Sequence, residues 1–178
     1  MENDLLKLEY RMYGLVAYQL SGTIHAGIQF GHAVVEYQQN TRDLKPQVDI
    51  YNKWAKEDKT FIILNGGTTN NTIDRFGTLN KHAKTLKDKG VLTAEFYEPD
   101  LGDQLTAVVF LVDERVWNRE LYEDFIPEVL PWSKNKPSEK KLLELENRNK
   151  VNYEHWVTKI GGSKNVFLRE FLKPLRLA

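Results

Sequence analysis

Cysteine is absent from this 178-residue sequence. Its absence excludes disulfide bonds, cysteine nucleophiles and thiolate metal ligands, and it is typical of proteins that work in a reducing compartment. Long hydrophobic runs are missing as well, because no stretch approaches the ~18 apolar residues of a membrane-spanning helix. The first residues include early acids and no uninterrupted apolar segment, unlike a secretory signal. These absences predict a cytoplasmic protein that makes no use of a membrane.

An excess of charge of one sign is also lacking, because 25 basic residues balance 25 acidic residues. Nucleic-acid-binding domains usually show a basic excess, so the overall charge gives no support for such a function, although a local basic patch is still compatible with it. The length predicts one domain with room for a terminal extension. Apolar residues make up 41% of the chain and charged residues 28%, which fits a globular domain with a polar surface or tail.

Strand and helix patterns alternate along the first two thirds of the chain. Apolar and β-branched runs predict strands over residues 10–20, 60–67, 91–100 and 105–114, and helical spacing predicts helices over 23–39, 46–57 and from the loop after Gly67 to Gly90. The near-continuous apolar character of 60–64 and 107–112 predicts strands covered on both faces. The order of elements predicts an α/β fold, a three-layer sandwich in which helices flank a small mixed β-sheet.

The character of the sequence changes after Trp117. Residues 121–137 contain three prolines, residues 138–156 are highly charged, and the last twelve residues are apolar and basic. We therefore expect an α/β domain over residues 1–117 and a helical C-terminal extension over 118–178, packed on the core or on a partner. Phe167, Phe171, Leu172 and Leu175 then either cover the protein's own core or form an amphipathic docking face.

A polar stripe runs along the helix predicted after Gly22. The spacings of four, three and four residues align His25, Gln29, His32 and Glu36 on one line of that helix. Apolar residues stand on either side, with Ile24, Ile28 and Val35 on one flank and Ala26, Phe30, Ala33 and Tyr37 on the other. Buried polar groups need partners, so a helix buried on both flanks is expected to turn this stripe toward a functional cleft. The alternative is a set of polar residues satisfied by backbone and water at a domain edge.

The junction between the first strand and this helix favours an anion. Gly22 and Thr23 are small residues at the helix start, where free backbone amides and the helix dipole attract a phosphate or carboxylate, and His25 lies in the first turn. Neither a Walker loop nor a dinucleotide fingerprint is present, so no cofactor is expected. A shared metal ion is not expected either, because seven residues separate His25 from His32 by about 10 Å along a helix.

Acidic residues near the end of the third predicted strand form a second candidate group. Asp100 ends that strand, Asp103 lies in the following turn, and Thr106 begins the next strand. Acids in tight turns are commonly turn formers, but a carboxylate at a strand end can also orient a histidine or activate water. Further candidates are basic: Lys81, Lys84, Lys87 and Lys89 either complement a helix dipole or contact an RNA backbone.

These residues resemble a known family, the type II (archaeal and eukaryotic) peptidyl-tRNA hydrolases. The family signature after the first strand is Lys, three small or apolar residues, Gln, two residues, and His-Ala-Ala. Here Gln29 and the His32-Ala33 pair match, whereas His25 stands at the lysine position. The family's Asp-Ala-Gly motif is similar to Asp100-Leu101-Gly102, and Thr106 resembles the threonine that opens its next strand. The resemblance covers about residues 8–116, and the segment after the Asp-Ala-Gly motif is shorter here.

The resemblance implies hydrolysis of the ester in peptidyl-tRNA, or in a related nucleotide ester, by an oriented water molecule. Asp100 and His32 would then act as the base and its orienter, and His25 would stabilise negative charge or grip a phosphate. The remaining site residues expected to contact substrate are Gln29, Thr23, Gly22, Thr106 and Asp103. The implied partner is tRNA or a small nucleotide-like ligand, and the family often dimerises, which also points to a homodimer.

The alternative function is non-hydrolytic binding. In this interpretation the same cleft holds a small phosphorylated or nucleotide-like ligand, with His25 at the family's lysine position. The balanced charge and the shortened segment after Gly102 favour binding, whereas the retained Gln29, His32 and Asp100 favour hydrolysis.

Overall fold

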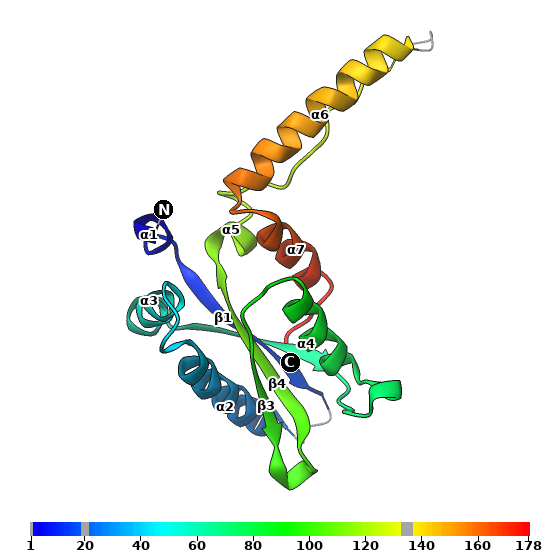
Figure 1. The fold of residues 1–178 in the computed structure, drawn as a ribbon. Helices are drawn as coiled ribbons and strands as arrows, with labels where there is room; N and C mark the ends of the chain where they lie inside the picture. Colours follow the sequence, from blue (N-terminus) through cyan, green and yellow to red (C-terminus); the bar gives the residue numbers. More distant parts are fainter. Residues whose placement is uncertain (1, 19–21, 133–136) are drawn as a thin grey trace. The chain divides into compact units, whose positions relative to one another are not determined.

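The computed structural model describes residues 2–18, 22–132 and 137–178. The chain divides into two compact units, one formed by Met1–Glu114 with Glu170–Ala178 and the other by Arg115–Arg169 (Figure 1). The sequence predicts a single extension over 118–178, whereas the structure places the last nine residues with the first unit. What the extension packs against stays a prediction.

A four-stranded mixed sheet forms the centre of the first unit. Its strands are β1 (Tyr10–Ala17), β2 (Thr60–Gly67), β3 (Ala94–Glu98) and β4 (Gln104–Asp113), in the order β2-β1-β4-β3. β2 runs parallel to β1, whereas β4 is antiparallel to both of its neighbours, β1 and β3. The predicted mixed sheet is therefore confirmed, although the last residues expected in its first strand, 19–20, lie outside the described part of the chain.

Helices cover both faces of this sheet. A short helix, α1 (Glu2–Leu5), precedes β1, and α2 (Thr23–Thr41) and α3 (Gln47–Lys53) follow it, α3 continuing into a π-helical turn (Trp54–Asp58). A 3-10 turn (Ile73–Arg75) leads to α4 (Thr78–Asp88), and a second 3-10 turn (Pro99–Leu101) follows β3. Figure 1 shows α2 and α4 on opposite sides of the sheet, which confirms the predicted three-layer α/β sandwich.

The strand period of two divides the core between these layers. Alternate residues of β1, such as Met12 and Val16, pack in one buried cluster with Phe30, Ala33 and Tyr37 of α2. On the α4 side, Leu79 and Leu86 are fully buried, as is Leu15 of β1. Local patterning was therefore sufficient to predict the four strands and the helices α2, α3 and α4, whereas the short α1 and α5 were not predicted. The pairing of layers follows from their apolar faces.

β2 departs from one expectation, that of a strand covered on both faces. The side chain of Phe61 is 53% exposed, because β2 is an outer strand of the sheet and helices do not enclose it. The C-terminal residues run along its free edge instead: Asn65 N donates to Arg176 O at 2.9 Å, and Ala178 N donates to Ile63 O at 3.1 Å. In contrast, residues 107–110 of β4 are fully buried, as predicted.

The C-terminal residues also pack on α4. The ring of Phe171 meets the ring of His82 edge to face, with centroids 5.3 Å apart. Burial lowers the pKa of His82 below its usual value, since a charged imidazole would be poorly solvated there. Phe171 therefore covers part of its own unit, which was one of the two alternatives for the apolar C-terminal residues.

The second unit is built around two helices and an extended segment. It contains α6 (Glu139–Lys159), most of α7 (Ser163–Leu172) and nearly all of the short α5 (Glu114–Trp117). Residues 118–132 run beside α6, where Asn149 exchanges two hydrogen bonds with the backbone of Glu128 at 2.8 and 2.9 Å. The Trp156 indole donates to Glu123 O at 2.8 Å. The helical character expected after residue 117 is confirmed.

Candidate functional site

The topology gathers the predicted site residues at one end of the sheet. The pairings Val16 with Ala107 and Glu98 with Gln104 place the ends of β1 and β3 beside the start of β4. The end of β2 lies there too, paired with Ala17, and α2 begins a few residues beyond β1. Strand ends that meet in this way are frequent ligand sites in α/β proteins.

Gln29 stands at the centre of this end of the sheet. Its side chain is buried, with 7% exposed. Its amide nitrogen donates to a carboxylate oxygen of Glu98, and its amide oxygen accepts a 2.6 Å hydrogen bond from the hydroxyl of the fully buried Thr106. Both polar ends of the amide are therefore used, and three elements, α2, β3 and β4, are joined by one chain of hydrogen bonds.

A β-bulge explains how Thr106 reaches α2. Phe96 of β3 pairs with Ala107, but its neighbour Tyr97 pairs with Leu105, so Thr106 is the extra residue of β4. Strict alternation would have turned Thr106 to the same face as Val108, away from α2. Bulges re-aim side chains in this way, and they are frequent beside functional sites. No signal in the sequence marks this one.

Glu98 is the site residue that sequence reasoning missed. Its two carboxylate oxygens accept from Gln29 and, at 3.5 Å, from the backbone N–H of Asp100, the second residue of the 3-10 turn after β3. The available signal was the strand period of two, because Ala94 and Phe96 face α2 and Glu98 continues that face. The carboxylate that contacts Gln29 is therefore Glu98, and Asp100 is exposed beside it.

The rest of the polar stripe lies at the margin of α2. His32 stacks on Phe96 with ring centroids 4.5 Å apart and an interplanar angle of 19°, yet it remains exposed, as do His25 and Glu36. The structure thus brings Gln29, His32 and the β3 end together. The lining of a cleft by His25 and Glu36 stays a prediction.

The expectation that α2 is buried on both flanks is wrong. Phe30, Ala33 and Tyr37 are buried against the sheet, but Ile24, Ile28 and Val35 are 76%, 48% and 54% exposed. A helix that lies on one face of a sheet covers that sheet with a single stripe, so its outer flank remains in solvent. The polar stripe is the boundary between these two flanks.

The remaining predicted residues lie around the strand ends. Gly22 precedes α2 with φ of 88° and borders a mostly apolar cavity of about 220 Å³ with Ala17, Ala26 and Asn65. Asp103 has φ of 55°, and its carbonyl accepts a hydrogen bond from the Asn71 amide. This geometry makes Asp103 a turn former. The side chain of Thr23 lies outside the described part of the structure.

The predicted basic patch is partly neutralised. Lys84 is 2.6 Å from a carboxylate oxygen of Asp88, and Lys87 is 2.7 Å from one of Glu95. Lys84 and Lys87 therefore each have an acidic neighbour, which weakens the attraction of this surface for a phosphate backbone.

Metal-binding clusters and membrane-spanning helices are both absent from the described part of the chain. No group of three or more His, Asp and Glu side chains in the described ranges is placed to hold a metal ion. Within the same ranges, no helix has the length and apolar character needed to cross a membrane. Comparison with known proteins adds no assignment, because no protein-family model matches the chain and a search of curated proteins finds no significant match.

Replacing Thr106 with valine tests the hydrogen-bond chain at the centre of the site. Valine keeps the shape but removes the hydroxyl that Gln29 accepts from, and an unsatisfied buried acceptor costs about 1–3 kcal/mol. We expect the urea midpoint of unfolding to fall correspondingly. The exposed Thr72 provides the matched control, and Thr72→Val should change the midpoint little. Equal midpoints for Thr106→Val and the unmodified protein would contradict the importance of this bond.

Proposed function

We propose that this chain is a divergent hydrolase of the peptidyl-tRNA hydrolase type, which cleaves the ester of peptidyl-tRNA or a related nucleotide ester. The observation that carries the proposal is the Thr106–Gln29–Glu98 chain of hydrogen bonds. It joins residues that the family resemblance singles out, Gln29 and Thr106, and it places the Asp100 backbone on the same carboxylate. Separate regions of the sequence, about 77 residues apart, meet at this point.

The burial of these residues separates two roles. Gln29 and Thr106 are buried and hydrogen-bonded to each other, so their proposed role is to hold α2 against the ends of β3 and β4. Asp100, His32 and His25 are exposed at or near that junction, so a substrate can reach them. Catalysis requires reactive side chains that a substrate can reach and that buried, hydrogen-bonded residues hold in position.

The proposed reaction is a hydrolysis that uses water and side chains of this protein. Water adds to the ester carbonyl carbon while a base, Asp100 assisted by His32, accepts one of its protons. The bond between the carbonyl carbon and the ribose oxygen breaks, and the proton passes to that oxygen. The products are a peptide acid and a free ribose hydroxyl. His25, when protonated, stabilises the negative charge that develops on the carbonyl oxygen or binds a phosphate.

One observation favours the second candidate, a non-hydrolytic binding protein for a small phosphorylated or nucleotide-like ligand. His25 stands where the family has its lysine, and its side chain is exposed. Loss of one group that stabilises the transition-state charge commonly costs about 10²–10³ in rate. The same residues would still be able to bind an anion.

The test is the release of tRNA from an N-acylated aminoacyl-tRNA by the whole chain. The hydrolase proposal expects turnover that falls about 10²–10⁴-fold in Asp100→Asn and in His32→Ala, the range for loss of general acid–base catalysis. Asp43→Asn and His155→Ala alter exposed residues of the same types elsewhere and should leave the rate unchanged.

The same experiment separates the two candidate functions. Absence of turnover, or turnover that is indifferent to both site variants, would contradict hydrolysis. Binding of a nucleotide monophosphate that weakens in His25→Ala, without turnover of the ester, would then support the binding function.

A further inference from the structure

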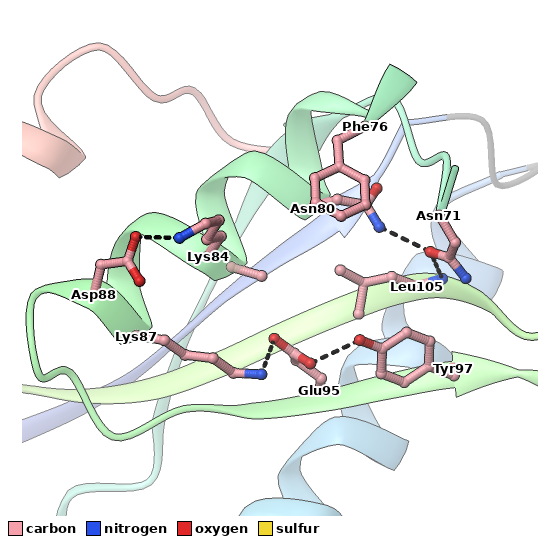
Figure 2. Close-up of a pocket in the computed structure, with 10 residues that line it drawn as sticks. Asn71, Phe76, Asn80, Lys84, Lys87, Asp88, Glu95, Tyr97 and Leu105 are labelled. Carbon is pink, nitrogen blue, oxygen red and sulfur yellow. Dashed lines mark hydrogen bonds and ion pairs between the residues drawn. The ribbon is translucent and has the colours of Figure 1, made fainter. Parts of the chain in front are cut away.

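A second pocket lies on the opposite face of the sheet from Gln29. Figure 2 shows this groove between α4 and the strands β3 and β4. Its volume is about 430 Å³, within the ~300–1,000 Å³ typical of small-molecule sites. Its lining residues all belong to the first unit, and the proposed hydrolysis uses none of them.

The floor of the groove is apolar and its rim is aromatic. Leu105 and Ala83 form the floor and are 1% and 3% exposed. The rings of Phe76 and Tyr97 border the opening, and the Tyr97 side chain is 43% exposed. An apolar or aromatic group placed here would bury surface against the floor and contact the accessible Tyr97 ring.

A nearly buried carboxylate stands on the β3 side of the groove. The Glu95 side chain is only 11% exposed, and its two oxygens accept from Lys87 at 2.7 Å and from the Tyr97 hydroxyl at 2.8 Å. Burial and the negative Glu95 raise the pKa of Tyr97 to about 12, so the phenol remains a hydrogen-bond donor. Glu95 is therefore a fixed negative group whose cationic partner, Lys87, is itself 55% exposed.

The charges of the α4 side weaken the attraction of the groove for an anion. Lys84 is held by Asp88 at 2.6 Å, so neither of the two lysines that line the groove offers an uncompensated positive charge. Both lysines lie toward the C-terminal end of α4, where the helix dipole adds partial negative charge. A phosphate or carboxylate ligand would have to displace Asp88 or Glu95 from its lysine, close to the carbonyl end of a helix.

We propose that this groove binds a small organic cation, a primary ammonium group carried on an aromatic body. The ammonium group would take the place of the half-exposed Lys87 amine at Glu95, and the aromatic body would lie on Leu105 and Ala83 beside the Tyr97 ring. Contact of the cation with that ring adds a cation–π attraction. Asn80, also part of the lining, donates to Asn71 at 2.8 Å, which holds these two amides in place.

Two probes that share a phenylethyl body and carry opposite charges test the proposal. Isothermal titration of the whole chain with 2-phenylethylamine should show binding, and 3-phenylpropionate should bind at least tenfold more weakly. Glu95→Gln keeps the size of the side chain and removes its charge, so it should weaken amine binding at least tenfold. Glu144→Gln, an exposed change on α6, should have no effect.

If Glu95→Gln fails to fold, the unmodified protein still tests the proposal through its backbone amide resonances. Backbone amide resonances of Ala83 and Tyr97 should shift on addition of the amine, whereas those of Gln29 and Thr106 on the other face should not. Equal or tighter binding of the acid, amine binding that survives Glu95→Gln, or no binding of the amine at all would overturn the proposal. None of these results depends on whether the chain hydrolyses esters.

Discussion

Replacement of Arg169 with methionine is expected to lower the free energy of unfolding of the Arg115–Arg169 unit by several kcal/mol, since each buried carbonyl left without a donor costs about 1–3 kcal/mol. The Arg169 side chain is 1% exposed, and its guanidinium donates to the carbonyl oxygens of Arg115 and Tyr122 and, at 2.7 Å, to the carboxylate of Asp124. A methionine fills similar space but leaves backbone acceptors without a donor, and no substitution can remove those carbonyls.

The charge of Asp124 adds to this effect. Its partial burial would raise the pKa of the carboxyl, but hydrogen bonds from Arg169 and Arg119 lower the pKa below its usual value. The carboxylate is 50% exposed, so solvent screens much of this attraction. Most of the loss in Arg169→Met should therefore come from the unsatisfied carbonyls and a smaller part from the lost ion pair.

Urea unfolding followed by the far-ultraviolet helical signal measures this prediction, since α6 and α7 supply much of the helix. Lys164→Met is the matched control, because it removes an exposed cation from the same helix and should shift the midpoint little. Arg169→Lys keeps the charge, but a lysine cannot make all the hydrogen bonds of the planar guanidinium. Its urea midpoint should therefore lie between those of Arg169→Met and Lys164→Met. A midpoint of Arg169→Met equal to that of Lys164→Met would contradict the assigned role.

The second large effect is expected at Gly14, in the middle of β1. A Cβ atom added there would lie 2.2 Å from Cδ2 of Phe30 and 3.1 Å from a methyl group of Val109. The Phe30 ring is 4% exposed and packs edge to face on Phe61 with centroids 5.3 Å apart, so it has little room to move. Gly14→Ala should destabilise the first unit by about 1–3 kcal/mol, the usual cost of overpacking a core.

Gly31→Ala is the matched control for Gly14→Ala. Gly31 lies within α2, and an added Cβ would meet nothing within 4 Å. Alanine is the better helix former by roughly 0.5–1 kcal/mol, so this variant should raise the urea midpoint while Gly14→Ala lowers it. The same sign of change for both variants would show that the close approach of Phe30 does not limit position 14.

Part of the candidate site follows from the sequence alone. The spacing of Gln29 and His32 and the threonine after the Asp100 turn identify three residues that the fold brings to one end of the sheet. Two features escape sequence reasoning. The burial of Gln29 depends on which elements cover it. The bulge that turns Thr106 toward Gln29 depends on the register of two strands.

Local physical chemistry determined the strands, the helices and their order in this protein, because apolar periodicity and glycine breaks act within a few residues. The α/β layering follows from those apolar faces. Only the tertiary structure decided that one flank of α2 stays in solvent, that Glu98 meets Gln29, and that Arg169 becomes the buried centre of the second unit. Burial and hydrogen-bond partners arise from contacts between distant segments. The spacing of residues can indicate the face of a strand on which a side chain lies, as for Glu98, but not the residue that it contacts.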